Sequence, residues 1–210
     1  MSIFIEEDTE GKKIELTIGV IIALFAAILA INDLGAGRYG DDEMIAHNQQ
    51  AKQYSWYQSK SIKQNLHENQ VDLLETLEHT NVINQESKSL LDSIRKEKIE
   101  EIKRYKKEKK EILLGSSEVG QDNWMLEDDS GKMGNITGAK QWEETAEQLG
   151  GAGDYFDLGT LFLQICIVFG AISLVIQKTS TRRIFLYLMI FVGVLGTIFT
   201  IFAYQEALKV

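Results

Sequence analysis

Three apolar blocks constrain this chain more than any other feature. They run from about residue 14 to 34, from 158 to 177 and from 184 to 204. A helix of about 20 residues, rising about 1.5 Å per residue, crosses the hydrocarbon core of a bilayer, which is about 30 Å thick. We therefore expect three transmembrane helices, with most apolar side chains facing lipid and few left for a globular core.

The polar stretch between the first two blocks carries most of the charged residues. A cleaved signal peptide is disfavoured, because the first block is longer than a usual signal and follows an acidic segment. The expected order of segments is a tail at 1–13, a membrane helix at 14–34, a polar domain at 35–157, a membrane helix at 158–177, a turn at 178–183, a membrane helix at 184–204 and a tail at 205–210.

Basic residues beside the blocks predict the orientation. They are Lys12, Lys13, Lys178, Arg182 and Arg183. Short loops rich in lysine and arginine stay in the cytoplasm. We therefore expect a multi-pass protein of the cell inner membrane, with the N-terminal tail and the turn in the cytoplasm and the polar domain in the periplasm.

Residues 41–114 contain no glycine or proline, which favours long helices. Two apolar stripes follow the helical period: the first is Ile62, Leu66, Leu73 and Leu77, and the second is Leu91, Ile94, Ile99, Ile102, Tyr105 and Ile112. An antiparallel hairpin that breaks at HTNVINQES, around Asn81 and Asn84, would bury both stripes. Pairing as a coiled coil within one chain or between chains stays open. The predicted fold class is an all-α membrane protein with a helical-hairpin, coiled-coil extramembrane domain.

Glycine-containing segments suggest breaks in the helices. GAGRYG (35–40) and GGAGD (150–154) are expected to be flexible necks, where the polar domain leaves and re-enters the bilayer. Asp41 or Asp42 is a plausible helix N-cap. Residues 115–138 are predicted to be an acidic, glycine-rich loop, and a short helix over 139–150 is expected to end at Gly150 and Gly151.

Residues 38–75, RYGDDEMIAHNQQAKQYSWYQSKSIKQNLHENQVDLLE, resemble the signature of a bacterial family, domain-of-unknown-function family 4337. The matching positions are Asn48, Gln49, Ala51, Tyr57, Gln58, Lys60, Ser61, Ile62 and Lys63. A closing membrane hairpin that opens on a glutamine-containing helix, LFLQICIVFGAISLV, is also similar to that family. The resemblance implies this topology and a bacterial inner-membrane setting, and it implies no reaction.

Residues that could carry chemistry do not form a site. Glu43 and His47, like Glu75 and His79, are four positions apart, whereas carboxylate-bridged di-iron bundles use a spacing of three together with further glutamates. Cys166 lies inside an apolar block, where burial makes a thiol unreactive. We assign no catalytic, metal-binding or cofactor-binding residue, expect no cofactor and do not expect an enzyme.

The net charge of the chain disfavours nucleic acid as a partner. The formal net charge is −9, which disfavours a nucleic-acid-binding protein because phosphates require a basic surface. Residues 95–111 hold nine basic and five acidic side chains with isoleucines at helical spacing. We interpret them as a charged coiled-coil helix. The alternative is contact with a membrane surface or with nucleic acid.

The remaining candidates are interaction residues. Aromatic rings near the membrane are typical of an interfacial belt or of a protein–protein surface, and an amide inside a bilayer usually bonds across helices. The candidates are Tyr54, Trp56, Tyr57, Ile62, Leu66, Leu73, Leu77 and Gln164.

A structural or interaction role follows from these patterns. We expect a homo-oligomeric, self-associating scaffold or an accessory subunit of a larger membrane complex, whose partners are the lipid bilayer and other membrane proteins. An oligomeric channel or transport-associated protein is the alternative, although no charged side chain lies deep in the blocks. An unrecognised membrane enzyme is the third possibility.

Overall fold

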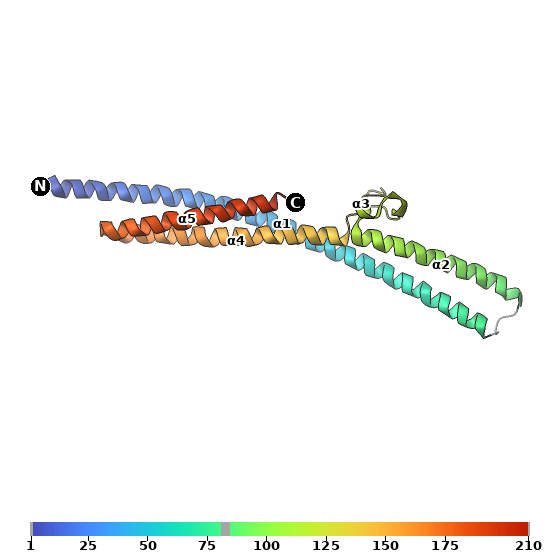
Figure 1. Cartoon of the computed structure of the whole chain (residues 1–210). Helices are drawn as coiled ribbons and strands as arrows, with labels where there is room; N and C mark the ends of the chain where they lie inside the picture. Colours follow the sequence, from blue (N-terminus) through green and yellow to red (C-terminus); the bar gives the residue numbers. More distant parts are fainter. Residues whose placement is uncertain (1, 81–84, 210) are drawn as a thin grey trace. The chain divides into compact units, whose positions relative to one another are not determined.

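The structure is a computed structural model that describes residues 2–80 and 85–209, with side chains from 11–80 and 88–209. Its elements are α1 (Ser2–His79), α2 (Gln85–Leu114), α3 (Ser116–Val119), the 3-10 helix η1 (Gln121–Asn123), α4 (Ala139–Val175) and α5 (Thr179–Ala207) (Figure 1). The chain divides into two compact units. Unit 1 is Met1–Met44 with Ala146–Val210, and unit 2 is Ile45–Thr145.

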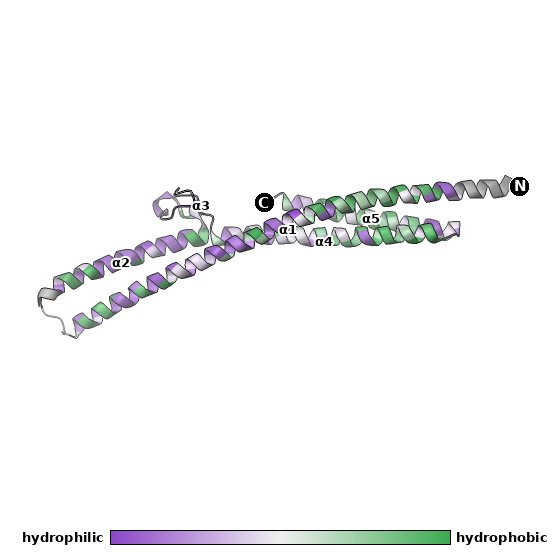
Figure 2. Cartoon of the chain, turned by 180° about the vertical axis from the view of Figure 1, so that it is seen from behind, coloured by the Kyte–Doolittle hydropathy of each residue, from purple (hydrophilic) through white to green (hydrophobic). Residues whose placement is uncertain are grey.

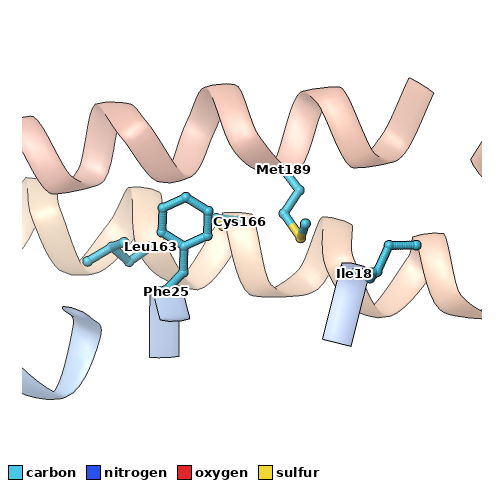
Figure 3. Close-up of a cluster of buried hydrophobic side chains, with 5 residues drawn as sticks. All are labelled: Ile18, Phe25, Leu163, Cys166 and Met189. Carbon is cyan, nitrogen blue, oxygen red and sulfur yellow. The ribbon is translucent and has the colours of Figure 1, made fainter. Parts of the chain in front are cut away.

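Unit 1 contains the apolar helices. Within the described residues, α1, α4 and α5 are each long and apolar enough to cross a membrane, which confirms this part of the expected architecture. Their contact is a cluster of buried side chains, shown in Figure 3: Ile18 and Phe25 from α1, Leu163 and Cys166 from α4, and Met189 from α5. Side chains on the outer faces are apolar as well, as expected for helices that face lipid.

The glycine-containing segments are not necks, and this expectation was wrong. α1 runs without a break through Gly35, and α4 continues through Gly150, so Asp41 and Asp42 lie inside a helix rather than at its N-cap. A Cβ atom on Gly35 would lie 2.6 Å from the Tyr204 hydroxyl oxygen. Because Gly35 has no Cβ atom, α1 and the Tyr204 side chain can pack closely here. Gly35 therefore serves helix packing and is not a flexible hinge.

Unit 2 contains an antiparallel pair formed by α2 and residues 45–79 of α1. Lys109 donates to the Ser61 hydroxyl at 3.0 Å, near one end of the pair. Arg95 donates to Glu78 at 3.0 Å, near the other end. The predicted hairpin is therefore present, and Figure 2 shows its polar character in purple. Part of its predicted break, including Asn81 and Asn84, lies outside the described residues.

The segment expected to be a plain loop has its own internal organisation. Glu111, at the end of α2, is fully buried. Its carboxylate accepts hydrogen bonds from the Ser116 hydroxyl at 2.8 Å and from the backbone N–H groups of Met125 and Leu126 at 2.8 and 3.1 Å. Ile112, the residue after Glu111, belongs to a small apolar cluster with Leu126 and Ile136 of the irregular segment. These bonds and contacts hold the irregular segment against α2.

Candidate functional site

The first apolar stripe lies on the surface of unit 2. Ile62, Leu66 and Leu73 are 69%, 56% and 59% exposed, and Leu77 is half-buried. The second stripe is half-buried or buried throughout, and it ends at the fully buried Ile112. The expectation that the hairpin buries both stripes was therefore wrong for the first one.

Polar contacts along the hairpin explain this exposure. A helix turns about 100° per residue, so Gln64 lies about 200° around α1 from Ile62, nearly on the opposite face. Gln64 is buried. Nearby, the Lys60 ammonium lies 2.6 Å from the Glu108 carboxylate, and both side chains are largely buried. The polar face of α1 meets α2, and the apolar stripe faces away.

The candidate aromatic residues lie in unit 2 and make contacts with other residues of the same unit. The Tyr54 hydroxyl donates to the Glu143 carboxylate at 3.1 Å, and this bond raises the pKa of Tyr54 above its ordinary value. Trp56 and Tyr57 are half-buried and pack against the cluster of Ile112, Leu126 and Ile136. The Lys109 ammonium lies 5.1 Å from the centre of the Tyr57 ring. These rings help to fix the irregular segment.

Gln164 is exposed on α4, whereas Asn32 of α1 is a fully buried polar side chain of unit 1. The Asn32 amide nitrogen donates to the Phe156 carbonyl at 3.0 Å and to the Thr160 hydroxyl at 2.8 Å. Its oxygen accepts from the Thr200 hydroxyl at 2.8 Å. One side chain of α1 is thereby bonded to both α4 and α5.

Sequence reasoning missed Asn32 because it stands near the end of the first apolar block, where a polar residue is unremarkable. The signal that could have found it is the combination of an asparagine with small and hydroxyl residues on the other two helices. Gly159 belongs to this set, since a Cβ atom there would lie 2.6 Å from the Asn32 amide oxygen. The Thr160 hydroxyl also donates to Asp33 at 3.0 Å.

A second polar link in unit 1 involves Arg182, near the start of α5. Its guanidinium is 3.0 Å from the Glu15 carboxylate of α1, and it donates to the Ile176 carbonyl at 2.9 Å. Arg182 is largely buried, although the sequence identified it only as a basic turn residue. It joins the turn between α4 and α5 to α1 and satisfies a carbonyl group left unbonded near the end of α4.

The acidic segment of unit 2 has an ordered core around Asp128. Its carboxylate accepts hydrogen bonds from the backbone N–H groups of Ser130 and Lys132, and from the Asn135 side chain. The Ser130 hydroxyl donates to it as well, at 2.6 Å. These donors hold the pKa of Asp128 well below its ordinary value, so this side chain is an anion near neutral pH.

The residues weighed as metal ligands do not converge. Within the described side chains, no group of three histidine, cysteine, aspartate or glutamate residues lies close enough to hold an ion. His47 shares a hydrogen bond with Gln50 at 3.3 Å, and Cys166 is fully buried in unit 1.

Unit 1 has two features of a helical membrane protein. Its helices are long and apolar enough to span a membrane, and buried polar side chains form hydrogen bonds between them. The family model described as "Domain of unknown function (DUF4337)" matches residues 15–206, and the chain belongs to that family. No curated protein and no solved structure matches the chain.

Proposed function

We propose that this chain is a self-associating scaffold of the bacterial inner membrane, in which unit 2 lies in the periplasm and pairs with unit 2 of a second copy. The exposed stripe of Ile62, Leu66 and Leu73 carries this proposal. Aligned apolar side chains in water favour a partner, because burying a leucine or isoleucine contributes about 1.5–3 kcal/mol. An accessory role, with another protein on the stripe, is the competing arrangement.

Membrane insertion favours a second copy as the partner. Copies in one bilayer share one orientation, so their α1 helices run parallel when they lie side by side. Parallel helices place identical residues opposite one another, and a stripe spaced at four and seven residues suits a coiled-coil seam. Ile62 and Leu66 of one copy then face the same residues of the next copy.

Pairing of this kind is tested by cysteine crosslinking in membranes. Leu66→Cys and Leu73→Cys, each in a Cys166→Ala background, should form disulfide-linked dimers under mild oxidation, because paired stripes bring equal positions within disulfide reach. Ser93→Cys, at an exposed position of α2, is the matched control and should stay monomeric. Equal crosslinking at all three positions would indicate random collision and contradict the proposed pairing.

A further inference from the structure

A groove in unit 2 has the size of a small-molecule site. Its volume is about 420 Å³, within the range of about 300–1,000 Å³ that is usual for such sites. One wall is a face of α1 with Gln49, Lys52, Gln53 and Trp56. The irregular segment and Trp142, near the start of α4, form the rest.

Gln53 has an unpaired hydrogen-bond acceptor and lines the groove. The side chain lines the groove and is about nine-tenths buried. Its Oε1 atom is buried and accepts no hydrogen bond from any described residue. Buried acceptors are nearly always satisfied, so the unpaired oxygen of Gln53 calls for a donor from outside the described residues.

The charge of the lining selects a cation. Glu127, Asp128 and Asp129 contribute three carboxylates, whereas Lys52 contributes one ammonium group, 3.8 Å from Asp129. Both members of that pair are exposed, and exposed pairs are weak, so a second cation can compete for the carboxylate. The lining is therefore net acidic and can hold a positively charged group.

Indole rings select an organic cation over a metal ion. Trp56 and Trp142 both line the groove. Ring faces attract ammonium groups, and in this unit the Lys60 ammonium already lies 6.0 Å from the centre of the Trp56 ring. An alkyl chain can pack on the same rings, whereas a hydrated metal ion cannot.

We propose that this groove binds a small organic cation, an alkylammonium or a diamine, whose ammonium group donates to Gln53 Oε1. The carbon chain lies against Trp56 and Trp142, and the positive charge lies near the carboxylates of residues 127–129. An ammonium group has three donors and no acceptor, which matches an unpaired oxygen beside carboxylates. The proposal does not depend on pairing between copies.

Isothermal titration of the full-length chain in mild detergent tests this site with diaminobutane as the probe. Glucose and butanol are the neutral comparisons, and sodium chloride keeps the ionic strength constant. Saturable binding of diaminobutane is expected. Gln53→Leu should weaken it about tenfold or more, because a hydrogen bond to a charged group is lost. Trp142→Leu should weaken it as well.

Gln58→Leu is the matched control, because it makes the same change at an exposed position of α1 and should bind like wild type. Circular dichroism establishes that each variant retains its helices. Three outcomes would overturn the proposal: no saturable binding of diaminobutane, equal binding by wild type and Gln53→Leu, or stronger binding of glucose than of the diamine.

Discussion

Thr200 of α5 donates a hydrogen bond of 2.8 Å to the side chain of Asn32 in α1, across 168 positions of sequence. Asn32 also donates to the Phe156 carbonyl and the Thr160 hydroxyl of α4. In lipid, a hydrogen bond that a side-chain amide makes between two helices stabilises their association by about 0.6–2 kcal/mol. Asn32 therefore links all three apolar helices through its side chain.

Asn32→Leu should lower the stability of unit 1 by about 2 kcal/mol, because three hydrogen bonds are lost and the partner hydroxyls lose a bonding partner. Unfolding in a denaturing-detergent titration, followed by loss of helix signal, measures the change. Gln164→Leu is the control, since the Gln164 side chain is exposed in unit 1 and should not alter single-chain stability. A larger effect of Gln164→Leu than of Asn32→Leu would reverse these assignments.

Glu111→Ala should destabilise unit 2 by about 3 kcal/mol, since the Ser116 hydroxyl and two backbone N–H groups lose a charged acceptor. Urea unfolding followed by tryptophan fluorescence is the measurement. Trp124 is a suitable reporter because its indole N–H donates to the Ser116 carbonyl at 2.8 Å. Glu118→Ala, at an exposed position, should change little. Equal midpoints for the two variants would contradict a structural role for Glu111.

Acid should loosen the segment around Asp128. Its pKa is lowered in the folded state, so its stabilising contribution is present above the unfolded value of about 3.9 and is lost as the pH falls through the folded value. Limited proteolysis by an acid-stable protease should therefore show faster cleavage of this segment at a pH below about 4. Asp128→Asn should weaken this pH dependence, whereas Asp122→Asn should leave it unchanged. A wild-type profile that matches Asp128→Asn would refute the assignment.

The long helices and their hairpin were predictable because the relevant signals are local. A block of about 20 apolar residues specifies a membrane helix by its length, and the absence of glycine and proline from 41 to 114 predicts long helices. The roles of Gly35 and Asn32 were not predictable this way. Each depends on residues more than 120 positions away, Tyr204 for Gly35 and Phe156 for Asn32.

The exposed stripe shows the same limit in unit 2. Periodicity located the row from Ile62 to Leu77, but it could not say which face of α1 meets α2. The Lys60–Glu108 pair and the buried Gln64 decide that face, and they join residues that no periodic pattern connects. Tyr54, Trp56 and Tyr57 are unusual for a plain coiled coil, and their contacts supply a reason. Trp56 and Tyr57 pack against the cluster that includes Leu126 and Ile136 of the irregular segment, and Tyr54 donates to Glu143 of α4.

Topology is tested by cysteine labelling in intact cells, again in a Cys166→Ala background. Ser117→Cys and Asn135→Cys, both at exposed positions, should react with a membrane-impermeant reagent from the periplasm. Ser180→Cys, exposed beside the basic turn, should react only after the cells are permeabilised, because lysine and arginine keep such turns in the cytoplasm. Labelling of Ser180→Cys alone in intact cells would invert the orientation.

The mass of the native particle in mild detergent tests self-association most directly, by light scattering corrected for bound detergent. We predict that wild type is a multiple of the 23.7 kDa chain and contains no other polypeptide. Leu66→Asp with Leu73→Asp should reduce it to a monomer, because each carboxylate would lose its hydration in the seam, while Ser93→Asp should keep the wild-type mass. A wild-type particle that is already a monomer, with no other protein bound, would contradict the scaffold.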